Sequence, residues 1–352
     1  MKKLRILGVS AGQGALLFPF INRENCKILG NIESRGVFHT PNEEQWKANF
    51  GNIPFLREGF DPKFKPNIIV SSPDCGASSI MRLSKVKQLG NPEENKSLNM
   101  VIQAILYYNP RVFLIENLPR LLSLIPIKYF EDIFNEYHLK FHEVSVSAFG
   151  NSQISRKRLI IIGARSRITF KRFIGIFKVN TIKLSRNSLE AAYFKSKSNN
   201  YNYMIPLNKT LAMYDYRKLP KKENLTVKEI HDLWMGDFKD EKKWPIKTAR
   251  MSTLPGVYRL EEDKHPLTVR PADRQFRPDG WPLGLGDIRN IMGFPKTFRI
   301  YMDDSSERSY LYWLNKGRYT LAKGSVYEVG EWFRQCLVRD KNVCESDHYA
   351  QL

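Results

Sequence analysis

Five short apolar runs, separated by polar or amphipathic spacers, do most to restrict the fold of the first half of this chain. The runs are LRILGV, KILGNIE, NIIVSS, VFLIEN and RLIIIGA. Continuous apolar runs of this length, bounded by turn signals, are typical of strands buried on both faces of a parallel sheet. Helices are expected between them, over residues 15–22 and 98–108, and would cover that sheet. The sequence therefore predicts a doubly wound α/β domain.

The charge of the chain points to a polyanionic partner. The 352 residues carry a formal net charge of +20, which favours binding to nucleic acid by release of counterions. Much of the excess falls in residues 164–270, where 23 Lys and Arg residues stand against 11 Asp and Glu residues. That stretch also interleaves basic and tyrosine residues, as in YDYRKLPKKEN, a mixture suited to phosphates and bases. A solvated surface insertion is the alternative reading.

These patterns divide the chain into three parts. Residues 1–164 are expected to form the α/β domain, and residues 165–265 a smaller basic domain. Residues 266–352 form a C-terminal segment whose closing amphipathic stretch, GSVYEVGEWFRQCLV, is expected to pack as a helix on the first domain.

Other classes of protein are disfavoured by composition. The four cysteines contain no CxxC pair and have no metal-ligand spacing with the six histidines, so neither a disulfide framework nor a metal site is expected. No run of about eighteen apolar residues occurs, and the first residues do not form a signal-peptide core. We expect a cytoplasmic, monomeric protein of bacterial or viral origin that makes no contact with a membrane.

Polar residues of catalytic type follow the apolar runs directly. Gly12 comes after the first run, Glu33 closes the second, Cys75 follows the third and Glu116 the fourth. Ligands of open α/β sheets bind beyond the carboxyl ends of the strands, which is where these residues would lie. A glycine there lets a ligand approach the backbone, and a carboxylate at the end of the second strand commonly accepts hydrogen bonds from ribose hydroxyls. Taken alone, the glycine turn would equally serve a dinucleotide or a plain connection.

Cys75 and Glu116 are candidates for chemistry. Cys75 lies in SSPDCGASS, a loop flanked by proline and glycine in which a nucleophile can be held exposed, although a buried structural cysteine is the ordinary alternative. Glu116 ends a strongly apolar strand, where partial desolvation would raise its pKa. The basic triplet Arg156, Lys157 and Arg158 precedes the fifth run.

The order of these features resembles one known family. AGQG, PDC, ENL, SRKRLIIIG, RNIMGFPKTF and GSV occur in the order and at the spacing of the motifs of DNA cytosine-5 methyltransferases. The resemblance covers about residues 1–163 and 255–335, and the basic stretch between them takes the place of that family's target recognition domain. It implies a Rossmann-like, S-adenosylmethionine-dependent methyltransferase fold and double-stranded DNA as the partner.

The resemblance also implies roles for individual residues. Cys75 would be the nucleophile that adds to C6 of a flipped cytosine, and Glu116 would stabilise the charge placed on the ring. Arg158 would hold the base carbonyl or orient the carboxylate, and Arg156 would support the loop or a phosphate. The residues expected at the S-adenosylmethionine site are Ser10, Ala11, Gly12, Gln13, Gly14, Glu33, Pro73, Leu98 and Ser325.

Several positions depart from the family pattern. Asp74 replaces a second proline before the cysteine, and a carboxylate beside the thiol opposes thiolate formation. Gly76 replaces a glutamine, Gln153 lies one residue too far upstream of the arginines, and Lys323-Gly324 stands where Gly-Asn is usual. The acidic residue that meets the adenine has only one weak candidate, Asp61.

Three other readings remain open on the sequence. The first is the same chemistry on RNA, such as a tRNA cytosine, which would leave the cofactor half alike. The second is a catalytically silent DNA-binding homologue, against which the joint presence of Cys75, Glu116 and Arg158 argues. The third is a dinucleotide-dependent oxidoreductase, which accounts for neither PDC nor ENL.

Overall fold

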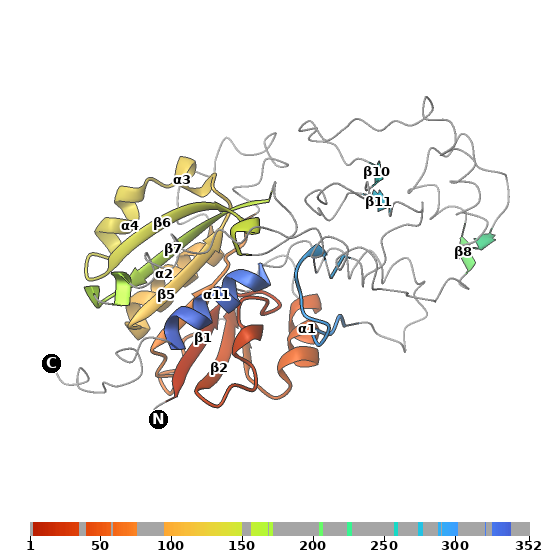
Figure 1. The fold of residues 1–352 in the computed structure, drawn as a ribbon. Coiled ribbons are helices and arrows are strands. Elements are labelled where there is room, and N and C mark those ends of the chain that lie inside the picture. Colours follow the sequence, from red (N-terminus) through yellow and green to blue (C-terminus); the bar gives the residue numbers. More distant parts are fainter. Residues whose placement is uncertain are drawn as a thin grey trace.

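The structure is a computed structural model (Figure 1). It describes residues 3–34, 40–57, 59–75, 95–149, 156–167, 169–171, 288–289, 291–301, 321 and 326–338, with four three-residue strands within 204–276.

A seven-stranded mixed sheet forms the centre of the described fold. Its strand order is β3-β2-β1-β4-β5-β7-β6. The strands are β1 (Leu4–Val9), β2 (Cys26–Glu33), β3 (Phe55–Arg57), β4 (Ile68–Ser71), β5 (Val112–Asn117), β6 (His138–Ser145) and β7 (Lys157–Ala164). β1, β2, β4 and β5 pair in parallel, as their apolar runs predict, and the short edge strand β3 pairs in parallel with β2.

The direction of β7 corrects the sequence interpretation. The run RLIIIGA was expected to be a parallel strand, but β7 pairs antiparallel with both β5 and β6. The reason is β6, a strand that alternates between exposed and partly buried residues and so lacks the continuous apolar run of the others. β6 returns the chain to the edge of the sheet where the strands end, and β7 starts from there.

Helices and short turns connect the strands. They are η1 (Phe18–Phe20), α1 (Thr40–Phe50), α2 (Lys96–Tyr108), α3 (Leu121–Leu124), α4 (Ile127–Ile133), η4 (Val146–Phe149) and α11 (Tyr327–Val338). The helix expected over 98–108 is confirmed as α2, which begins where the side chain of Asn95 accepts the Leu98 N–H and ends at Asn109 in the left-handed conformation.

The prediction of a helix over residues 15–22 is wrong. Only the 3-10 turn η1 forms there, and Phe20 N–H donates to the Leu17 carbonyl three residues back. Pro19 stands in the first turn of η1 and has no N–H to donate to a carbonyl four residues back, so a regular helix cannot run through it.

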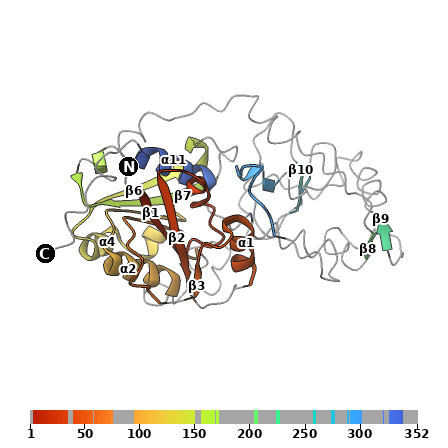
Figure 2. The ribbon, with the colours of Figure 1, turned by 90° about the horizontal axis from the view of Figure 1, so that it is seen from below.

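Two apolar layers cover the sheet, one on each face. On one face the side chains of Leu4, Ile6 and Val70 pack with α11, η1 and the end of α1. On the other face Leu7, Val9 and neighbouring side chains pack against α2, α3 and α4. Figure 2 shows α2 and α4 on one side of the sheet and α11 on the other. The result is a three-layer α/β fold of the kind predicted.

The closing helix α11 returns to the first domain, as the sequence predicts. The ring of Trp332 lies 5.5 Å from that of Phe149, and Phe333 is fully buried. A Cβ at Gly330 would collide with the carbonyl oxygen of Leu16, so glycine lets this helix lie directly on the turn that follows β1.

The basic middle of the chain lies mostly outside the described residues. Within it the structure describes β8 (Met204–Pro206) paired with β9 (Asn224–Thr226), and β10 (Val257–Arg259) paired with β11 (Arg274–Phe276). The three predicted domain boundaries stay predictions. Across the described part of the chain, no helix is long and apolar enough to cross a membrane.

Candidate active site

The candidate residues meet at one edge of the sheet. β2, β1, β4 and β5 are parallel neighbours, so Glu33, Ser10, Ser72 and Glu116, which end or directly follow these strands, come to the same edge. β7 is antiparallel to β5 and therefore begins at this edge, which brings Arg158 beside Glu116. Had β7 been parallel, its first residues would lie at the opposite edge. The antiparallel strand thus completes the site.

The loop after β1 has a strained, open backbone. Ser10, Gly12 and Gly14 all have positive φ, at 49°, 58° and 83°. Around Gly12 a Cβ would meet nothing within 4 Å, which leaves the backbone accessible to a ligand. A Cβ at Gly14 would instead collide with the rings of Phe50 and Trp46. Gly12 therefore suits a close ligand approach, whereas Gly14 is required by packing.

Glu33 faces this loop. Its Oε1 accepts hydrogen bonds from Gly12 N at 2.6 Å and from Asn31 Nδ2 at 2.9 Å. Neither of these two hydrogen bonds involves the second carboxylate oxygen of Glu33, Oε2. Burial raises the pKa of Glu33 to about 7, and the negative charge of Asp74 adds to the rise, while the two hydrogen bonds oppose it. This carboxyl group is therefore partly protonated at neutral pH.

The loop that carries Cys75 is anchored through its backbone. Asn117 Nδ2 donates to the Pro73 carbonyl at 3.1 Å, and Asp74 N donates to Ser97 Oγ at 2.8 Å. Ser97 belongs to the first turn of α2, so that helix and β5 hold the loop from two sides. Cys75 itself is half-buried, four residues after the end of β4.

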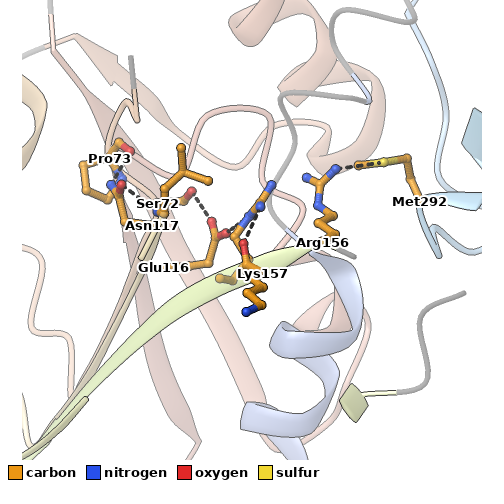
Figure 3. A network of polar contacts seen from close by, with 9 residues as sticks. Ser72, Pro73, Glu116, Asn117, Arg156, Lys157 and Met292 are labelled. Carbon is orange, nitrogen blue, oxygen red and sulfur yellow. Dashed lines mark hydrogen bonds and ion pairs between the residues drawn. The ribbon is translucent and has the colours of Figure 1, made fainter. Parts of the chain in front are cut away.

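Glu116 is held by two donors from different elements. Ser72 Oγ donates to Glu116 Oε2 at 2.7 Å (Figure 3). Arg158 Nε lies 2.7 Å from Glu116 Oε1. Only 3% of Glu116 is exposed, so this ion pair neutralises a charge that burial would otherwise penalise. The Ser72 N–H also reaches the carbonyl of Ser10 at 3.3 Å, which connects the carboxyl site to the cofactor loop.

Arg156 has a different position from Arg158. It is buried, and its Nη1 lies 3.3 Å from Met292 Sδ, as Figure 3 also shows. Burial lowers the pKa of Arg156 to about 9, and the positive charge of Arg158 lowers it further, while Glu116 and Cys75 raise it. Cys75 thus lies within electrostatic reach of Arg156, and Arg156 joins the catalytic half to the segment around Met292.

The remaining candidates divide into three groups. Ala11 and Gln13 are buried in the loop after β1. Leu98 is fully buried among apolar side chains of α2, so a contact with a cofactor stays a prediction. Ser325, Gly76, Gln153 and Lys323-Gly324 lie outside the described residues.

No cluster of metal-binding type is present within the described ranges, and the three cysteines there form no disulfide bond.

Sequence reasoning missed the residues that support the site. Ser72, Asn31 and Ser97 each bond to a candidate residue or its backbone, and Met292 contacts Arg156. Two of them stood next to recognised features: Ser72 ends the run NIIVSS, and Asn31 stands two residues before Glu33, on the same side of the strand. A polar residue interrupting an otherwise apolar strand was the available signal.

A family model agrees with this geometry. The model of the C-5 cytosine-specific DNA methylases matches residues 36–311, most of the chain. The chain belongs to this family. Members transfer a methyl group from S-adenosylmethionine, and the open backbone at Gly12, with the half-engaged carboxylate of Glu33 beside it, fits the nucleoside part of such a donor. A search of curated protein sequences finds no match.

Solved structures show the same fold at low sequence identity. A candidate DNA modification methyltransferase from an E. coli prophage aligns with a TM-score of 0.61 at 14% identity, covering 96% of this chain and 99% of that one. The methyltransferase EhMeth of Entamoeba histolytica gives 0.57 at 16% identity, with 96% and 98% covered. The Dnmt2 methyltransferase of S. pombe gives 0.53 at 14% identity, with 96% and 99% covered. These similarities extend over nearly the whole length of each protein.

Proposed function

We propose that this family member methylates carbon 5 of cytosine in double-stranded DNA, using S-adenosylmethionine and a covalent cysteine adduct. The observation that carries the proposal is the arrangement around Glu116: a buried carboxylate held by Ser72 and Arg158, on the strand next to the one that leads into Cys75. Carbon 5 of cytosine is too weak a nucleophile to accept a methyl group unaided. Cys75 and Glu116 together would raise the electron density at this carbon.

Cys75 begins the reaction. Its thiolate adds to C6 of the ring, the C5–C6 double bond opens, and electron density moves to C5 and toward N3. The Arg156 guanidinium group favours the thiolate, against the nearby carboxylate of Asp74. Bound S-adenosylmethionine supplies an electrophilic methyl group at its sulfonium. A base, water in the simplest case, then takes the C5 proton, the C5–C6 double bond forms again, and the C6–S bond breaks with its electron pair returning to the sulfur of Cys75; the proton on N3 returns to Glu116.

Glu116 acts on the opposite side of the ring. Sharing a proton with N3, it stabilises the charge that addition of the thiolate places there. Arg158 and Ser72 fix the carboxyl group in one orientation, so that little reorganisation accompanies the step. A cytosine stacked in a duplex cannot reach both groups, so the base must leave the helix, at a cost of a few kcal/mol.

The cofactor end is assigned to the loop after β1. Gly12, through its backbone, and Glu33, through its carboxylate, are the proposed contacts to the nucleoside, with Ser10, Ala11, Gln13, Gly14, Pro73 and Leu98 around them and Ser325 beyond the described residues. The excess of 23 basic over 11 acidic residues in 164–270 supports DNA as the partner and that region as the recognition domain.

A methyl-transfer assay tests this proposal. The protein is incubated with S-adenosylmethionine tritiated in its methyl group and with either mixed duplex DNA or total tRNA, and the labelled base is identified. Label on 5-methylcytosine in DNA, lost in Cys75→Ser, is the expected result. Label on tRNA alone would transfer the proposal to RNA, and no label on either would favour a silent binding protein.

A further inference from the structure

Asn31 is a polar residue near the end of a strand, between Gly30 and Ile32. It lies in β2 and is fully buried. Its Nδ2 donates to Glu33 Oε1 at 2.9 Å and lies 3.3 Å from the Gly12 carbonyl, and its Oδ1 lies 3.4 Å from Ala11 N. A buried amide is costly unless it is hydrogen-bonded, and every partner of this amide belongs to the candidate cofactor site.

The neighbouring strand leaves room for this side chain. Gly8 of β1 is in register with Asn31, and a Cβ at Gly8 would come within 2.6 Å of Asn31 Oδ1. The amide therefore occupies space that another residue at position 8 would fill. The contact matters beyond simple packing, because the same amide touches both the backbone of the loop after β1 and the carboxylate that ends β2.

We propose that Asn31 is a positioning residue of the cofactor site, which locks the loop at Ala11 and Gly12 to the Glu33 carboxylate before the nucleoside binds. The inference rests on the proposed use of S-adenosylmethionine. Asn31 occupies Oε1 of Glu33 and leaves Oε2 for the ribose hydroxyls. Because the loop and the carboxylate are already joined in the free protein, binding of the cofactor costs less ordering.

The amide also controls the charge of Glu33. Desolvation and Asp74 raise the pKa of Glu33, whereas the Asn31 amide and the Gly12 N–H lower it. Asp74, on the loop after β4, is the charged group of the described residues that acts on this carboxyl. Without Asn31 a smaller fraction of Glu33 is ionised at neutral pH, and a protonated carboxyl accepts hydrogen bonds from hydroxyl groups less well.

Calorimetric binding of S-adenosylhomocysteine to the full chain tests the proposal. We expect Asn31→Ala to bind about tenfold more weakly than the native protein at pH 7.5. Asn67→Ala is the matched control, because Asn67 Oδ1 also accepts a backbone N–H, that of Arg5 at 2.7 Å, but at the opposite end of β1 from the loop. The control should bind as the native chain does.

The pH dependence separates positioning from a general loss of packing. Native binding should weaken as the pH falls through about 7 and Glu33 takes up a proton, and Asn31→Ala should show the same fall about one pH unit higher. The amino group of S-adenosylhomocysteine also titrates, but it does so identically for every variant, so a difference between variants reports on the protein. Asn31→Asp, which keeps the shape but replaces the donating amide group by an acceptor, should shift the fall in the same direction.

A ligand without the 2′-hydroxyl completes the test. The native protein should prefer S-adenosylhomocysteine over its 2′-deoxy analogue, and this preference should shrink in Asn31→Ala but not in Asn67→Ala. Folded Asn31→Ala and Asn31→Asp proteins with native affinity, pH profile and ligand preference would overturn the inference. If Asn31→Ala does not fold, Asn31→Asp decides. Failure of the native protein to bind S-adenosylhomocysteine would instead reject the proposed cofactor.

Discussion

Two carboxyl groups, the half-buried Glu33 and the buried Glu116, stand at the same edge of the sheet with different partners. Glu33, on the cofactor side, is bonded by an amide and a backbone N–H, both neutral, and has a pKa of about 7. Glu116, on the base side, is paired with the cation of Arg158 and accepts a hydroxyl from Ser72. The difference teaches that burial alone does not fix the role of a carboxyl group: Glu33 has neutral partners and a pKa raised by burial, whereas Glu116 is held in an ion pair.

The largest effect on kcat is expected from removing the charge of Glu116, the carboxyl group proposed to contact the cytosine base. Glu116→Gln should lower kcat for DNA methylation at least a hundredfold, because the amide cannot share a proton with the ring and loses its ion pair with Arg158. Binding of S-adenosylhomocysteine, measured by calorimetry, should stay within about twofold of native. Loss of cofactor binding in this variant would show that the two carboxyl groups are not independent.

The cofactor side should respond to pH through Glu33. Its pKa is raised on folding, so the stability that it contributes is complete below its unfolded value of 4.5 and is lost as the pH rises through about 7. The loss is on the order of 3 kcal/mol. Urea unfolding between pH 4.5 and 8.5 should show this decline in the native chain and a flatter profile in Glu33→Gln. Parallel profiles for the two proteins would contradict it.

The two glycines of the cofactor loop should separate binding from stability. Gly14→Ala drives a methyl group into Phe50 and Trp46 at a positive φ and should destabilise the protein by about 2 kcal/mol or more. Gly12→Ala meets open space, so only its φ opposes the change, and it should cost about 1 kcal/mol of stability. Thermal melts together with calorimetry should show that Gly12→Ala loses more cofactor affinity than stability.

The smallest effect is expected at Ser72. Ser72→Ala removes one of the two donors to Glu116 but keeps the backbone contact to Ser10, so kcat should fall about fivefold with little change in cofactor binding. Ser72→Thr retains a hydroxyl and should restore most of the rate. An Ala variant with native kcat would mean that Arg158 alone positions the carboxyl group.

The sequence predicted the parts of the fold that depend on local pattern. Continuous apolar runs identified the parallel strands, and amphipathic spacing identified α2 and α11. It gave the wrong direction for β7, because strand direction depends on β6, whose half-exposed residues lack an apolar run. It also predicted a helix around Pro19, whose missing N–H and ring interrupt the interior of a regular helix; the short 3-10 turn η1 forms there instead.

The site was predictable to the extent that motifs follow strand ends. Cys75, Glu116 and Glu33 were found in this way. Ser72 and Asn31 were not, because a polar residue in an apolar run indicates a buried hydrogen bond without identifying the partner, and Glu116 and the loop at Gly12 lie 44 and 19 residues away. Arg158 could be named from the family resemblance, but its contact with Glu116 depends on the antiparallel strand that the pattern did not reveal.

Covalent capture tests the central claim most directly. Random-sequence duplex DNA containing 5-fluorocytosine in place of cytosine is incubated with the protein and S-adenosylmethionine, because fluorine at C5 cannot leave as a proton does and the sulfur cannot be eliminated. The account predicts a denaturant-stable adduct, dependent on the cofactor, that peptide mass spectrometry places on Cys75. Methylation of ordinary DNA without any such adduct, or an adduct on another residue, would contradict it.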